Sequence, residues 1–207
     1  MSQSQLSIRI IYDILPEDLP IDTVIYCFAH NDINIPYIAQ HIKLLSNIYP
    51  VYILENINNM SGVSECKSVE KLYNSFSIPI KFIPYDNNWI NTKIESKAVI
   101  DWCIKNKIKN IIICAPIFHI VRAYMTMVSS QLDKGHNIDI NIYAQSAPID
   151  KWSNTTITHQ GKSINSFNNF IRIELDRIDE YALKGDIKDP QTIWEYMMKR
   201  EKTENNI

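Results

Sequence analysis

Residues 91–127 read NTKIESKAVIDWCIKNKIKNIIICAPIFHIVRAYMTM, with polar residues gathered at the joints between apolar runs. In the middle, residues 111–114 form a short, isoleucine-rich run between two stretches of helical pattern. Such a run is typical of a strand that is buried on both faces of a parallel sheet. The stretch therefore predicts a helix, a strand, a sharp turn and a second helix, in that order.

The polar residues after this strand predict a ligand site. In open α/β sheets, ligands bind beyond the carboxyl ends of the strands, and here that edge carries His119 and Arg122. The two residues are three apart at the start of a helix, so they share one helical face. Arg122 offers a fork of donors for a carboxylate or phosphate, and a helix N-terminus adds free N–H groups and partial positive charge. We therefore expect a small anionic ligand here.

The same stretch allows a functional and a structural interpretation. In the first, Glu95 orients His119 for acid–base catalysis, and Asn91 and Thr92 belong to the binding site with Arg122. In the second, Arg122 pairs with a neighbouring carboxylate and His119 is a hydrogen-bonded core histidine. Thr92 and Glu95 then form a capping box at a helix start. The sequence leaves open whether the protein is an enzyme or a non-catalytic interaction protein.

Three short blocks resemble the signature blocks of the YdcF/SanA/ElyC-like family of bacterial α/β proteins. They are N-T-x-x-E at residues 91–95, A-P-x-x-H-x-x-R-A at residues 115–123 and S-G-x-S-E at residues 61–65. The resemblance covers residues 22–145. The chain differs from the family pattern after the first strand, where residues 28–31 are FAHN instead of a glycine-rich turn, and at Ser96, where the family has asparagine.

The resemblance implies a Rossmann-like domain, for which an adenosine-type ligand such as S-adenosylmethionine is the usual suggestion. It also implies that Gly62 and Glu65 belong to the site. His30 and Asn31 follow the predicted strand 24–29 and would lie at the same sheet edge. With no glycine turn at that position, the cofactor stays an open question.

Strand and helix patterns alternate along most of the chain, as βαβ units require. We predict a three-layer, Rossmann-like α/β domain with a mostly parallel five-stranded sheet in the order 3-2-1-4-5 and right-handed crossovers. The predicted strands are residues 24–29, 51–54, 80–83, 111–114 and 138–144, and the first two crossover helices are residues 36–48 and 66–76.

The C-terminal third predicts a loop and two helices. Residues 146–160 are polar and form either a surface loop or a lid over the carboxyl edge of the sheet. In the region 161–200, the first helix, residues 162–183, should pack on the sheet, and the second should begin at Asp189-Pro190. Residues 201–207 form a tail. The apolar stripe of the first helix is Ile164, Phe167, Ile171, Leu175, Ile178 and Ala182.

The composition predicts one globular domain and disfavours several classes of protein. Of 207 residues, 45% are hydrophobic and 21% are charged, and the formal net charge of −2 provides no basic field for nucleic acid. No apolar run is long enough to span a membrane, and the N-terminus does not resemble a secretory signal. We therefore expect a cytoplasmic protein, like the soluble branch of the resembling family.

The motifs of several enzyme classes are also missing from the sequence. The four glycines, at positions 62, 135, 161 and 185, cannot build a dinucleotide-binding or phosphate-binding glycine loop. There is no G-x-S-x-G motif for a serine hydrolase. The four cysteines have no C-x-x-C spacing, so we expect free, buried thiols and no metal site.

Overall fold

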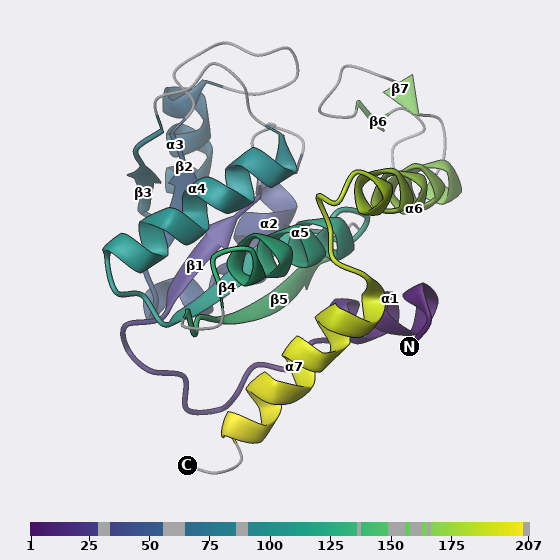
Figure 1. Ribbon diagram of the computed structural model, residues 1–207. Coiled ribbons are helices and arrows are strands. Elements are labelled where there is room, and N and C mark those ends of the chain that lie inside the picture. Colours follow the sequence, from purple (N-terminus) through teal and green to yellow (C-terminus); the bar gives the residue numbers. More distant parts are fainter. Residues whose placement is uncertain are drawn as a thin grey trace.

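The computed structural model describes residues 1–28, 34–55, 65–85, 91–135, 138–148, 156–157, 163–164 and 167–204. Within these ranges, five parallel strands form one sheet in the order β3-β2-β1-β4-β5 (Figure 1). The predicted fold class and strand order are therefore confirmed. The strands are β1 (Val24–Cys27), β2 (Val51–Leu54), β3 (Ile80–Ile83), β4 (Asn110–Pro116) and β5 (Asn141–Ala147).

The order of the strands reverses between β1 and β4. From β1 the chain moves outward through β2 to β3, whereas from β4 it moves to β5 on the other side. Cys27 of β1 lies opposite Cys114 of β4, and the Phe28 N–H donates to the Cys114 carbonyl oxygen at 2.9 Å. In sheets of this kind, ligands bind at such a switch point, beyond the carboxyl ends of the two strands.

Helices cover both faces of the sheet (Figure 1). One core contains residues of α2 (Ile35–Ile42) and α3 (Cys66–Ser75). The other contains residues of α1 (Gln3–Ile11), α4 (Thr92–Lys105) and α5 (Ile120–Leu132). Side chains of β1 alternate between them, because successive residues of a strand point to opposite faces: Ile25 and Cys27 toward the first core, Tyr26 and Phe28 toward the second.

Two C-terminal helices lie against α5. They are α6 (Phe167–Leu183) and α7 (Pro190–Glu204). Together with α1, α4 and the sheet, they bury all of residues 120–131 of α5. The structure also has a two-stranded antiparallel pair, β6 (Thr156–Ile157) with β7 (Ser163–Ile164). Within the described residues, no helix is both long and apolar enough to cross a membrane.

Several predicted boundaries need correction. The helix expected at 36–48 ends at Ile42, and a 3₁₀ turn, η1 (Leu45–Asn47), follows it. The strand expected at 138–144 begins at Asn141 and continues to Ala147, into the predicted loop or lid. Most of the remaining loop, residues 149–155 and 158–160, lies outside the described residues. The extension of β5 follows from its pairing with β4, because residues 145–147 lie opposite residues 114–116.

The C-terminal helices differ from prediction in position and in buried face. Helix α6 begins at residue 167 and lies against α5 instead of directly on the sheet, because α5 already covers that face. Its inward residues include Glu174 and Ile178, whereas Leu175 and Ala182 are exposed. Helix α7 begins as expected, with Asp189 Oδ1 accepting two backbone N–H groups, and continues to Glu204 instead of ending near 199.

Helix α1 was not predicted. Ser2 and Gln5 cap it reciprocally, with the Gln5 N–H donating to Ser2 Oγ and the Ser2 N–H donating to the Gln5 side chain. Its buried residues are Leu6 and Ile10, which join the core beneath α5. Two inward positions in a nine-residue helix give too short a periodic pattern for a sequence-based prediction.

Side chains from both ends of the chain cover the outer edge of β5. The Ala144 N–H donates to Asp13 Oδ2 at 2.9 Å, and the Ile142 N–H donates to the Tyr196 hydroxyl at 2.8 Å. Arg200 Nη1 donates to the Ile142 carbonyl oxygen at 2.5 Å. An uncovered edge strand is a template for pairing with another chain, so these contacts take the place of a sixth strand.

Candidate functional site

The structure describes six of the nine residues predicted for the site. Asn91, Thr92 and Glu95 come from α4 and the residue before it, and His119 and Arg122 come from the start of α5. The sixth, Glu65, is exposed at the start of α3, on the other side of the sheet. His30, Asn31 and Gly62 lie outside the described residues.

Arg122 is buried and holds a carboxylate that the sequence analysis did not assign to the site. Its Nε donates to Glu174 Oε2 at 2.6 Å and its Nη2 to Glu174 Oε1 at 3.2 Å. The third nitrogen, Nη1, donates to Thr92 Oγ1 at 2.5 Å. The ring centroid of Tyr181 lies 5.8 Å from the guanidinium carbon. The guanidinium of Arg122 therefore binds an anion, and this anion is the Glu174 carboxylate of α6.

Glu174 also accepts a hydrogen bond from Arg177 Nη1, at 2.8 Å. Burial raises the pKa of the Glu174 carboxyl, but the charge of Arg122 and the hydrogen bonds of the cluster lower it further than burial raises it. The net result is a pKa well below the usual range, so the carboxylate is ionised at neutral pH. The sequence contained a signal for this residue, because the spacing 171, 174, 178 places Glu174 within the predicted buried stripe.

His119 occupies the N-cap position of α5, without a capping hydrogen bond from its side chain, and lies beside the end of β1. Its ring centroid is 5.8 Å from that of Phe28, in an edge-to-face arrangement. Nδ1 is 3.1 Å from Arg122 Nη2 and 3.3 Å from Glu174 Oε2. Burial and the positive charge of Arg122 lower the pKa of His119, although Glu174 and Glu95 oppose them, so the ring is neutral at neutral pH.

Two neighbours compete for His119 Nδ1. Nη2 of Arg122 stays protonated and can only donate to Nδ1, whereas the ionised Glu174 carboxylate can only accept from it. A neutral ring with its proton on Nε2 accepts from Arg122, and a neutral ring with its proton on Nδ1 donates to Glu174. A doubly protonated ring would turn its Nδ1–H toward the guanidinium charge as well, and that charge is one cause of the lowered pKa.

This lowered pKa predicts how the stability of the fold depends on pH. As the pH falls below 6.5, the ordinary pKa of a histidine, an unfolded histidine takes up a proton that His119 in the folded protein resists. The free energy of unfolding of the parent should therefore decrease on acidification from that pH. His119→Gln should remove this part of the decrease. Urea unfolding of both proteins from pH 8 to pH 5 tests the prediction, and parallel curves would contradict it.

The residues at the start of α4 do not form the capping box of the structural interpretation. Asn91 is the N-cap, with Oδ1 accepting the Ile94 N–H at 2.9 Å, so the expected capping box of Thr92 and Glu95 is wrong. Glu95 is buried and accepts the Tyr26 hydroxyl at 2.6 Å. The carboxylate beside His119 Nδ1 is Glu174, while Glu95 influences the ring through its charge. The Thr92 hydroxyl instead accepts a hydrogen bond from Arg122 Nη1.

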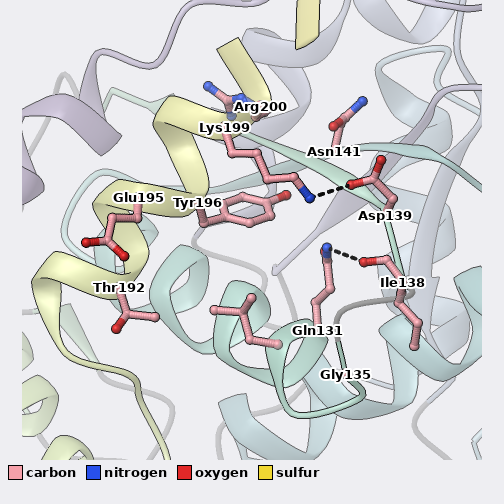
Figure 2. Close-up of a pocket in the computed structure, with 11 residues that line it drawn as sticks. Gln131, Gly135, Ile138, Asp139, Asn141, Thr192, Glu195, Tyr196, Lys199 and Arg200 are labelled. Atoms are coloured by element: carbon pink, nitrogen blue, oxygen red, sulfur yellow. Dashed lines mark hydrogen bonds and ion pairs between the residues drawn. The ribbon is translucent and has the colours of Figure 1, made fainter. Parts of the chain in front are cut away.

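A cavity of about 270 Å³ lies elsewhere, between α7, the end of α5 and the chain before β5 (Figure 2). It is at the amino end of β5, whereas His119 and Arg122 follow the carboxyl end of β4. Lys199 and Asp139 on its rim are 3.6 Å apart and both largely exposed, so their ion pair adds little. Of the polar groups drawn in Figure 2, Tyr196 and Arg200 hold α7 against β5 through their hydrogen bonds to Ile142, and Gln131 donates to the Ile138 carbonyl oxygen.

The cysteines are free thiols. Cys27, Cys103 and Cys114 are buried, as predicted, and Cys66 is partly buried. Burial raises the pKa of the Cys27 and Cys103 thiols to about 12. Such thiols are protonated and unreactive at neutral pH.

The cluster at the carboxyl edge thus combines the guanidinium of Arg122, the neutral imidazole of His119, the ionised carboxylate of Glu174 and the buried carboxyl group of Glu95. A site of this kind can hold an anion through Arg122 and donate a hydrogen bond through His119. No protein-family model matches this chain. No curated protein matches it significantly in sequence either.

Proposed function

We propose that the protein binds a small anionic or nucleotide-type ligand at the carboxyl edge of the sheet, as a relative of the YdcF-like proteins. One observation carries the proposal. Arg122, His119 and Thr92, from two different helices, meet beside the end of β1, next to the switch point of the sheet. That is where ligands bind in α/β proteins with this strand order.

In this proposal each residue of the cluster has a defined role. Arg122 binds the anionic group and His119 donates a hydrogen bond to a neighbouring ligand atom. Thr92 orients Arg122, and Asn91 holds the start of α4 in place. If the ligand reacts, His119 with the charge of Glu95 nearby is the acid–base group. S-adenosylmethionine is the cofactor candidate that the family resemblance contributes.

The alternative is a non-catalytic protein that retains the fold. A specific observation favours it, namely that all three nitrogens of Arg122 have partners within the chain. The cluster would then fix α6 on the core and bind nothing. The two proposals differ in one measurable respect, because only the first requires Arg122 to contact a ligand.

A ligand screen with matched variants tests the proposal. We expect at least one nucleotide, S-adenosylmethionine, sugar phosphate, prenyl phosphate or small carboxylic acid to raise the melting temperature of the parent. Arg122→Lys keeps the charge but removes the fork. It should weaken binding by about 1.5–3 kcal/mol, the usual contribution of a hydrogen bond to a charged group. Isothermal titration calorimetry measures the difference.

Arg177→Lys is the control for this experiment. Arg177 also contacts Glu174, but it lies on α6 and not at the start of α5. Its replacement should leave the affinity of the ligand unchanged. If Arg122→Lys binds the ligand as tightly as the parent while remaining folded, Arg122 is structural and the alternative holds.

A further inference from the structure

The candidate site already contains an anion. The two oxygens of Glu174 lie 2.6 and 3.2 Å from Nε and Nη2 of Arg122, which is the paired geometry in which arginine binds a carboxylate. This carboxylate comes from α6, whereas the groups that receive it come from α4 and α5 of the parallel α/β core. A movement of α6 would therefore withdraw the Glu174 carboxylate and leave Arg122 and Thr92 in place on the core.

We infer that Glu174 occupies the position of the anionic group of the ligand, that this group is a carboxylate, and that the ligand binds by displacing Glu174. The inference rests on the proposed function, because it concerns the same site. It adds the chemical class of the ligand and a competition between the ligand and α6. Binding then includes release of α6 from Arg122.

The charges around Arg122 favour a carboxylate over a phosphate. When Glu174 moves away on α6, Arg177 moves with it, because both belong to that helix. Among the described residues of the cluster, the charged groups that remain are then Arg122 and the buried Glu95, whose charge acts on His119. A doubly charged phosphate would meet one cation and one carboxylate in a poorly solvated place, whereas a carboxylate brings a single charge.

Helix α6 is attached in a way that permits this competition. One side of the helix contacts the core through Glu174, Ile178 and Tyr181. Its other side is solvent-exposed over residues 175–176, 179–180 and 182–183. Among the described residues of α6, the buried polar contacts with the core are those of Glu174 with Arg122 and His119. A ligand that takes over Arg122 removes that attachment and shifts the population toward a released helix.

Glu174→Gln tests the inference, because glutamine keeps the shape of the side chain and removes its charge. Acetate is the probe, with inorganic phosphate as the competing anion class and chloride at matched ionic strength as the blank. We expect acetate to bind Glu174→Gln roughly 5- to 150-fold more tightly than the parent, the usual range for coupled sites. Glu180→Gln, an exposed change on the same helix, should behave like the parent. Adding Arg122→Lys to Glu174→Gln should abolish the gain.

The outcomes separate this inference from the proposed function. Equal acetate affinity in the parent and Glu174→Gln overturns the competition, and tighter binding of phosphate than of acetate overturns the carboxylate class. Either result leaves anion binding at Arg122 intact. If neither acetate nor phosphate binds Glu174→Gln, the inference is wrong. The proposed function is tested separately, and it is wrong if no compound in the ligand screen binds the parent.

Should Glu174→Gln not fold, amide hydrogen exchange on the parent decides. Acetate in excess over matched chloride should accelerate exchange in residues 172–183 and leave that of the α7 amides unchanged. Unchanged exchange in residues 172–183 at a concentration that raises the melting temperature overturns the competition.

Discussion

Replacing Arg200 by alanine is expected to lower the free energy of unfolding by about 3 kcal/mol, because the buried Asp13 carboxylate loses its two closest hydrogen bonds to a cation and keeps the more distant Arg9, at 3.5 Å. Arg200 Nη2 and Nη1 lie 2.6 and 2.9 Å from the two oxygens of Asp13. The side chains of Arg200 and Asp13 are 1% and 0% exposed. The guanidinium carbon is also 4.5 Å from the centroid of the Tyr143 ring.

The same replacement uncovers part of the β5 edge, because the Ile142 carbonyl oxygen loses its closer donor, Arg200, and keeps the Tyr124 hydroxyl at 3.3 Å. We therefore expect the variant to associate with itself at high concentration as well as to unfold more easily. Urea unfolding and size-exclusion chromatography measure the two effects. Lys199→Ala is the control, since the Lys199 side chain is 71% exposed, and it should change the free energy of unfolding by less than about 0.5 kcal/mol. If Arg200→Ala also lowers the free energy of unfolding by less than about 0.5 kcal/mol, the pair of Arg200 and Asp13 does not hold α7 in place.

The second large effect is expected at the pair of Arg122 and Glu174. Glu174→Leu alone should cost about 3–5 kcal/mol in the free energy of unfolding, because it leaves the buried Arg122 guanidinium without a carboxylate. Arg122→Met alone should cost less, because Glu174 keeps its ion pair with Arg177. The double variant should recover most of that loss, since replacing a whole buried pair by apolar side chains is close to neutral. Urea unfolding of the four proteins measures the coupling energy of the cycle. Additive single losses would show that the two side chains do not act as a pair.

The ion pair of Arg122 and Glu174 also predicts a decrease in the free energy of unfolding at acid pH. The pKa of Glu174 is lower in the folded protein than in the unfolded chain, so its ionised form contributes stability above the ordinary value of 4.5. That contribution is lost progressively as the pH falls below 4.5, because the unfolded chain then takes up a proton that the folded protein resists. Glu174→Leu should lack this loss. An acid titration followed by circular dichroism compares the two proteins.

Much of the fold could be predicted from local sequence. The strand order followed from the alternation of apolar runs and helical patterns, because βαβ units permit few arrangements. The common helical face of His119 and Arg122 followed from their spacing, and the structure brings them within 3.1 Å of each other. The ends of the elements were less predictable, as β5 shows by starting at Asn141. The short helix α1 has too few inward residues to give a pattern.

The partners of the buried charges could not be predicted in the same way. Arg122 and Glu174 are 52 residues apart, and Asp13 and Arg200 are 187 apart. Local spacing specifies which side of a helix faces inward, but it does not specify which distant helix that side will meet. The sequence is compatible with a carboxylate partner for Arg122 but does not specify which carboxylate it is.

By itself, then, the sequence determined a parallel α/β domain with a cation and an imidazole at the carboxyl edge of its sheet, because βαβ alternation and helical spacing are local properties. Tertiary structure alone decided that Glu174 occupies the fork of Arg122 and that Asp13, Tyr196 and Arg200 cover the β5 edge. The reason is physical: a buried charge or an open strand edge must find a partner, and only the packing of α6 and α7 on α5 brings that partner within reach.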